Sequence, residues 1–229
     1  MKKQMSDKLI ISILLALAGG IMDAYSYTLR GKTFATLQTG NLILMGINFV
    51  NNNTSKALMY LLPIMSFTIG SFISQIVENI SNKLKFLHWR QVSIVFEIIM
   101  CIIVSFIPQG DLDFLANMLI SYAAGMQLQS FRKTKGLGIA TTMCTGNMKS
   151  FGASIANAIT YKDKKILLNS LIYLSLILSF FVGVLISYDL ARHINTYTTL
   201  IALIPLLIVF ILMFIKFEEE FDSEIPQNE

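Results

Sequence analysis

The sequence carries one short pattern twice, "TFATLQTGNLILMGIN" at residues 33–48 and "IATTMCTGNMKSFGAS" at residues 139–154. In each copy a Thr-Gly-Asn triplet is followed by a glycine five positions after the asparagine. A displacement of 106 residues places Thr36 on Thr142, one triplet on the other, and Gly46 on Gly152. Aligned Gly, Thr and Asn arise by chance in an apolar chain far less often than aligned Leu or Ile. We therefore interpret the pattern as an internal duplication.

The match continues on both sides of the triplets. Ala18-Gly19 aligns with Ala124-Gly125, and at a displacement of 113 the run "SFTIGSFIS" (66–74) aligns with "SFFVGVLIS" (179–187). The duplication predicts a first repeat over residues 1–110 and a second over 111–216. We expect the acidic tail, 217–229, to be disordered.

The composition indicates a membrane protein. Of 229 residues 54% are hydrophobic and 14% charged, with a mean hydropathy of +0.63, whereas soluble domains carry about 25% charged residues. Six apolar segments approach the roughly 20 residues that a membrane-spanning helix needs: 8–30, 57–77, 91–108, 112–131, 166–188 and 194–215. The first resembles a signal peptide, but its Ala18-Gly19 recurs within the chain, so we expect it to stay as the first span. The predicted fold class is all-α integral membrane with six transmembrane helices.

Other classes of protein lack support in the sequence. The two cysteines form no disulfide pattern, and no metal-binding, nucleotide-binding or nucleophile motif is present. We therefore expect neither an enzyme nor a cofactor. The basic residues lie between apolar runs, which argues against a nucleic-acid partner and makes them topology signals.

The triplet segments, about 39–50 and 145–158, are short for full spans. They either cross the membrane or dip in and return as re-entrant half-helices. If they dip, 13 basic residues lie on the cytoplasmic side and 4 outside, leaving aside Lys149 within the second triplet segment. The 13 are Lys2, Lys3, Lys8, Lys83, Lys85, Arg90, Arg132, Lys133, Lys135, Lys162, Lys164, Lys165 and Lys216, and the 4 are Arg30, Lys32, Lys56 and Arg192. If they cross, the tally becomes 8 against 9. Cytoplasmic loops are enriched in Lys and Arg, so the sequence favours the dipping arrangement with both termini in the cytoplasm.

Three full spans in each repeat place the second copy upside down relative to the first. Inverted repeats recur in secondary transporters, where the site lies near the midplane between them. The triplets suit such a place. Thr39 and Thr145 are good N-cap residues, Gly40 and Gly146 allow close approach or unusual dihedral angles, and Asn41 and Asn147 offer both donors and acceptors. The alternative is that the triplets are only turns and caps that let two hairpins pack.

Further polar residues fall within apolar segments. Asp23 and Glu97 are candidates because carboxylates at membrane depth often mark ion, proton or solute pathways. Asp23 could instead pair with Arg30 or Lys32, and Glu97 could lie near Arg90 or Lys85. Gln129 aligns with Asp23, and Gln127 stands beside it. We expect Gln38, Gln75, Gly70 and Gly183 to serve helix–helix contacts.

The runs "GGIMDAYSYTLRGKTFATLQTGNLILMG" (19–46) and "AAGMQLQSFRKTKGLGIATTMCTGNM" (123–148) resemble the YoaK-like family of bacterial membrane proteins, a family of unknown function. The resemblance covers about residues 8–215. It rests most on Gly19 with Asp23, on both triplets, and on Gly125-Met126-Gln127. It implies a multi-pass protein of the bacterial cytoplasmic membrane and no established substrate.

We expect a transporter or channel for a small polar or ionic solute, with Asp23 or Glu97 responding to protons or cations. The alternative is a non-transporting membrane scaffold or sensor subunit. The partners expected are the lipid bilayer and the solute, and the apolar surface is compatible with a homo-oligomer.

Overall fold

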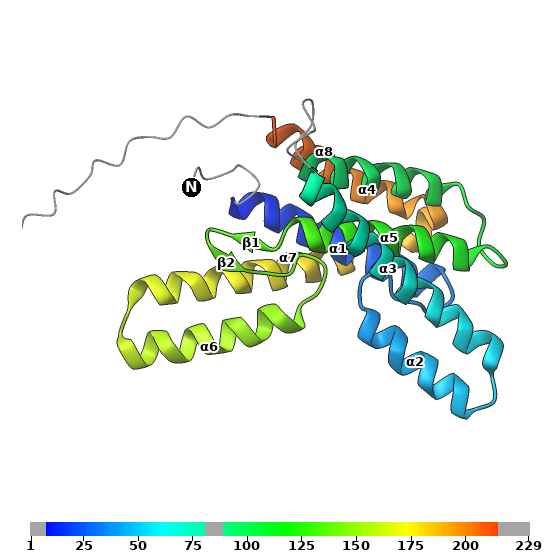
Figure 1. Cartoon of the computed structure of the whole chain (residues 1–229), viewed down its shortest axis with the longest axis horizontal. Helices are drawn as coiled ribbons and strands as arrows, with labels where there is room; N and C mark the ends of the chain where they lie inside the picture. Colours follow the sequence, from blue (N-terminus) through cyan, green and yellow to red (C-terminus); the bar gives the residue numbers. More distant parts are fainter. Residues whose placement is uncertain (1–7, 81–88, 215–229) are drawn as a thin grey trace, which may run out of the picture.

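The computed structural model describes residues 8–80 and 89–214, so the predicted tail (217–229) lies outside the described residues. Figure 1 shows the arrangement. The elements are α1 (Leu9–Leu29), α2 (Gln38–Val50), α3 (Thr54–Ile80), α4 (Trp89–Ser105), α5 (Asp113–Ser130), a hairpin of β1 (Lys133–Thr134) and β2 (Leu137–Gly138), α6 (Thr145–Tyr161), α7 (Lys164–Ile194), the 3-10 helix η3 (Asn195–Ala202) and α8 (Leu203–Leu212).

The described helices support an all-α transmembrane protein. Three helical stretches are long and apolar enough to cross a membrane: Leu9–Leu29, Thr54–Ile80 and Lys164–Leu212. The third is not one rod, because Asn195 adopts a φ of 50° at the end of α7. The chain then turns back through η3, and α8 packs against α1 and α4. The segment predicted at 194–215 therefore begins as a 3-10 helix and becomes α-helical only at Leu203.

The buried core lies mainly between α1, α4, α5, η3 and α8. Two close helix pairs join the two halves of the sequence. α7 packs along α1, and α3 packs along α5. Glycines make the approach close: a Cβ on Gly70 would overlap the carbonyl oxygen of Tyr122, and one on Gly183 would overlap that of Leu17. The expected role of Gly70 and Gly183 in helix–helix contact is confirmed. Their partners at the crossings are Gly125 in α5 and Gly20, rather than the aligned Gly19, in α1.

Serine hydroxyls bind backbone carbonyls across the same crossings. Ser71 Oγ donates to Gly125 O at 3.0 Å, and Ser179 Oγ donates to Ile13 O at 2.7 Å. Ser187 Oγ donates to Ile21 O at 2.9 Å. Small residues and hydroxyl groups of this kind are the usual means of joining helices in a membrane, where apolar burial gives little preference for protein over lipid.

The helices α2 and α6 form hairpins with the helices that follow them. α2 packs on α3, and α6 packs on α7. Figure 1 shows that the two run in opposite directions from the middle of the molecule. Their 13 and 17 residues correspond to lengths of about 20 and 25 Å, short of the roughly 30 Å of a hydrocarbon core.

The molecule has two ends, named here for their arginines. At the Arg30 end, where α1 finishes, Arg30 contacts the α4–α5 turn through Pro108 O and Asp113. At the Arg132 end, Arg132 Nη2 lies 2.7 Å from Glu78 Oε2 and ties the last turn of α3 to the residues after α5.

Candidate functional site

Two irregular segments return from opposite ends and meet beside the middle of α1. The segment 30–37 leads from α1 back to α2, and the segment 139–144 leads from β2 to α6. Thr36 Oγ1 lies 2.5 Å from Thr142 O, which joins them. Buried backbone without regular structure needs hydrogen-bond partners, and these segments find them in each other and in neighbouring side chains.

Asp23 is the side chain of α1 at this junction. Its Oδ1 accepts from Thr36 N at 2.7 Å, and its Oδ2 lies 2.7 Å from Thr36 Oγ1. Asp23 is 7% exposed, while Thr36 and Thr142 are fully buried. Thr142 Oγ1 has no hydrogen-bond partner among the described residues. The two segments and α1 are therefore linked through one carboxyl group and one hydroxyl group.

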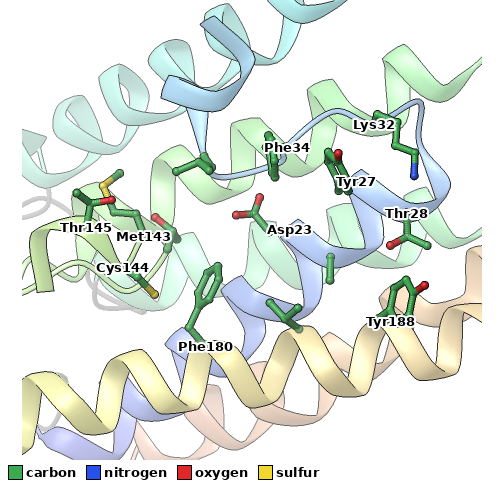
Figure 2. Close-up of a pocket in the computed structure, with 14 residues that line it drawn as sticks. Asp23, Tyr27, Thr28, Lys32, Phe34, Met143, Cys144, Thr145, Phe180 and Tyr188 are labelled. Atoms are coloured by element: carbon green, nitrogen blue, oxygen red, sulfur yellow. The ribbon is translucent and has the colours of Figure 1, made fainter. Parts of the chain in front are cut away.

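A cavity of about 560 Å³ opens next to this junction (Figure 2). It extends from Asp23 and Cys144 toward Lys32 and Tyr188, that is, toward the Arg30 end. Its wall is mostly apolar and aromatic, with a few polar groups, as is usual for small-molecule sites. The lining residues are Asp23, Ala24, Tyr27, Thr28, Lys32, Phe34, Leu37, Thr142, Met143, Cys144, Thr145, Phe180, Val184 and Tyr188.

Lys32 is the basic residue of this wall and is held away from Asp23. Its Nζ lies 5.0 Å from the centre of the Tyr27 ring, a cation–π distance. Tyr27 in turn stacks on Phe34, with ring centres 4.8 Å apart. The expected alternative of an ion pair with Arg30 is wrong: Arg30 pairs with Asp113 at 3.0 Å. Among the described residues Asp23 has no salt bridge.

The asparagines of the two triplets close the loops that precede them. Asn41 accepts from Phe34 N at 2.9 Å and donates to Phe34 O at 2.7 Å. Asn147 accepts from Ala140 N at 3.1 Å and donates to Ala140 O at 2.7 Å. Both are buried and neither lines the cavity. Each asparagine thus closes the turn that leads into its helix, which agrees with the turn part of the alternative in which the triplets are turns and caps.

The predicted N-caps are wrong. α2 starts at Gln38 and α6 at Thr145, so Thr39 and Thr145 lie inside the first turns, and neither helix has a side-chain cap. The physical reason is that the asparagine two residues after each threonine already binds the backbone of the incoming loop. Thr145 nevertheless lines the cavity, whereas Thr39 is exposed elsewhere.

The triplet glycines do not share one role. A Cβ on Gly40 would lie 2.8 Å from the Phe34 ring, so close approach explains this glycine. A Cβ on Gly146 would meet nothing within 4 Å. Neither glycine is among the described residues with positive φ, so the expectation of unusual dihedral angles is wrong for both.

None of the remaining candidates lines the cavity, and Gln127 is the one with a hydrogen bond to a junction segment. Gln127 Nε2 donates to Thr141 Oγ1 at 2.9 Å and so supports the segment 139–144 from α5. Gln129 Nε2 donates to Gln75 Oε1 between α5 and α3, in keeping with the contact role expected for Gln75. Glu97 is fully buried in α4, with no hydrogen-bond partner for either carboxyl oxygen among the described residues. It does not line the cavity.

Sequence reasoning did not single out the aromatic wall of Tyr27, Phe34, Phe180 and Tyr188, because aromatic residues are common in any apolar chain. The internal alignment places Thr36 on Thr142, but neither threonine was predicted to belong to the site. Their matching positions just before each triplet were the available signal, since a duplicated polar residue at membrane depth is costly unless it has a use.

Comparison with known proteins supports a membrane protein. No solved structure matches the chain. The UPF0700 transmembrane protein YoaK of Bacillus subtilis (strain 168) is 23% identical over 159 residues, which cover 66% of this chain and 69% of that protein. The family described as "Protein of unknown function (DUF1275)" matches residues 11–212. That match covers most of the sequence, and the chain therefore belongs to the DUF1275 family.

Proposed function

We propose that this protein transports a small polar or ionic solute across the cytoplasmic membrane. The solute would enter through the cavity beside Asp23 and pass the junction of the segments 30–37 and 139–144. One observation carries the proposal: a buried carboxyl group and two irregular backbone segments meet at the floor of an open cavity. Irregular backbone at membrane depth is tolerated only where it is buried in protein or lines a water-filled space.

The proposed topology has six spans, arranged as two inverted repeats of three, with α2 and α6 as re-entrant half-helices. The short lengths of α2 and α6 and their opposite directions support this arrangement. The matching hydrogen bonds from Asn41 to Phe34 O and from Asn147 to Ala140 O support it as well. In the proposal the Arg132 end faces the cytoplasm. Among the described residues, leaving aside Lys149 within α6, it would carry eight basic side chains (Lys8, Arg90, Arg132, Lys133, Lys135, Lys162, Lys164 and Lys165), against four at the Arg30 end (Arg30, Lys32, Lys56 and Arg192).

The junction is suited to act as a barrier that opens, because one hydrogen bond joins the two segments among the described residues. The two segments are joined through Thr36 and Thr142, while the long helices on either side are fixed by glycine crossings. In transporters with inverted repeats, one structural unit moves against the other around a fixed site. A barrier made of one hydrogen bond between two loops can open without breaking the helix pairs.

Cys144 gives a direct test because it is half-buried in the cavity wall, while Cys101 is fully buried. Purified protein in liposomes would be offered an isotopically labelled extract of small bacterial metabolites, and the accumulated solutes identified by mass spectrometry. We expect accumulation with the unmodified protein and its loss after reaction of Cys144 with a bulky maleimide. Cys144→Ala, treated in the same way, is the matched control and should keep its uptake.

If the folded, reconstituted protein accumulates no solute above empty liposomes, transport is rejected. A scaffold or sensor role would then account for the membrane-embedded junction.

A further inference from the structure

We propose that Asp23 holds a proton when the junction is closed, and that release of this proton separates the segment 30–37 from the segment 139–144. The inference rests on the proposed transport function and names the proton as its coupling ion. Asp23 is selected over Glu97 by position, because Asp23 bonds to Thr36 at the junction while Glu97 lies in α4 away from the cavity.

The argument starts from the hydrogens available at Thr36. Its hydroxyl oxygen lies 2.7 Å from Asp23 Oδ2 and 2.5 Å from Thr142 O. A threonine hydroxyl has one hydrogen to donate, and an ionised carboxylate and a backbone carbonyl can only accept. With Asp23 ionised, two acceptors would compete for one hydrogen, and one short contact would be left without a proton.

With a proton on Asp23, each of the three contacts among Asp23, Thr36 and Thr142 O has one hydrogen. The acid O–H at Oδ2 donates to Thr36 Oγ1, and the Thr36 hydroxyl donates to Thr142 O. Asp23 Oδ1 accepts from Thr36 N at 2.7 Å. The result is a continuous chain from α1 through one segment to the other. Buried polar groups in native proteins are almost always paired in this way.

Within residues 8–80 and 89–214, no charged group forms a salt bridge with Asp23 that could replace the proton. The titratable side chains that share the cavity wall with Asp23 are Tyr27 of α1, Lys32 of the segment 30–37, Cys144 before α6, and Tyr188 of α7. Lys32 is the only cation of this wall, and its ammonium lies over the Tyr27 ring rather than in a salt bridge with Asp23. An ionised carboxylate buried without a charged partner is unfavourable.

Loss of the proton has a defined consequence. Asp23 borders the cavity, so water there can accept the proton, and the ionised carboxylate then takes the hydrogen of Thr36. Thr142 O loses its donor, and Thr142 Oγ1 has no partner among the described residues that could hold the segments together. The junction is then free to separate, which would couple proton release to passage of the solute.

Infrared spectroscopy tests the proton directly. Glu97 is the other buried carboxyl group in the part of the chain that the structure describes. In Glu97→Gln protein we expect a carboxylic-acid carbonyl band at neutral pH that disappears reversibly as the pH is raised. The band should be absent when Asp23→Asn is added. Absence of any such band in folded Glu97→Gln protein at neutral and mildly acid pH would overturn the proposal.

Accessibility of Cys144 tests the consequence. In a Cys101→Ala background, an impermeant thiol reagent is applied from either side of the membrane, and the ratio of labelling from the Arg132 side to labelling from the Arg30 side is measured. The ratio removes the thiol's own dependence on pH. We expect it to rise at least tenfold as the pH is raised, because the open junction admits reagent from the Arg132 side.

The Asp23→Asn variant is the control, since its amide can donate to Thr36 Oγ1 as the acid does, and its ratio should stay low at every pH. An equal rise in Asp23→Asn would overturn the proposal. The two proposals fail separately. Transport without an Asp23 acid band would remove the proton proposal alone, whereas an acid band and a pH-dependent ratio without uptake would remove transport alone.

Discussion

Arg30 is a single residue on which three helices depend. It is fully buried, and each of its five N–H donors has an acceptor. The acceptors are Tyr25 Oη, Pro108 O, Asp113 Oδ1, Val104 O and Ile107 O. The guanidinium thus satisfies carbonyls that the end of α4 leaves open, and it fixes the point from which the segment 30–37 turns back toward the site.

Replacing Arg30 by Lys should destabilise the protein although the charge is kept. A lysine ammonium offers three donors in a different geometry, so buried carbonyls and Asp113 lose partners. Each buried acceptor left without a donor costs about 1–3 kcal/mol, which should appear as a large fall in the midpoint of thermal unfolding in detergent. Arg192→Lys is the control, because Arg192 is exposed and contacts only the Tyr188 ring among the interactions described for it. Equal midpoints for the two variants would contradict this account.

The two triplet asparagines should respond alike to substitution. Asn41→Ala leaves Phe34 N and O without their partner, and Asn147→Ala does the same to Ala140. Each unsatisfied buried group costs about 1–3 kcal/mol. Asn48→Ala removes only a bond to Leu44 O within α2 and should change the thermal midpoint little. A loss for one triplet variant but not the other would show that the two loops are not closed in the same way.

At the scale of the helix pairs, glycines at the crossings should tolerate no side chain. Gly70→Ala and Gly183→Ala place a methyl group on the backbone of the facing helix, and overpacking of this kind costs about 1–3 kcal/mol or more. Gly46→Ala and Gly152→Ala are matched controls, because a Cβ there meets nothing within 4 Å. Alanine should stabilise these helices by about 0.5–1 kcal/mol. Thermal midpoints that move in the same direction in both pairs would contradict the crossing geometry.

The helices were largely predictable because apolar run length decides where a chain can cross lipid. The starts predicted at 39 and 145 agree with Gln38 and Thr145, since the triplets mark where irregular backbone ends. The end of α7 at Asn195 was not predictable, because nothing in the sequence of this apolar segment indicates a residue with positive φ. Arg30 was taken as a topology signal. The acidic turn "PQGDLD" (108–113) lies on the same predicted side of the membrane as Arg30, which was a signal for the ion pair between Arg30 and Asp113. The positions of charges in the sequence do not show, however, that Arg30 is buried.

For the whole molecule, the pairing of α1 with α7 and α3 with α5 means that neither half of the sequence packs as a separate unit. Each half contributes one long helix to each pair and one short hairpin helix, α2 or α6, to the outside. The site is where the two irregular segments meet between these pairs. Its position near the middle of α1 follows from the length of those segments, which return only partway from either end.

The path of the chain through the membrane decides whether this geometry can serve transport. Single cysteines would be introduced at Asn51, Lys133 and Lys164, all exposed, in a background with Cys101→Ala and Cys144→Ala. If α2 and α6 are re-entrant, Asn51→Cys reacts from the periplasm, while Lys133→Cys and Lys164→Cys react from the cytoplasm. If α2 and α6 cross, Asn51→Cys and Lys164→Cys react from the same side and Lys133→Cys from the other. We expect the first pattern, because about 20 Å of α2 cannot span the hydrocarbon core without thinning it. The second would remove the inverted repeats and with them the midplane site.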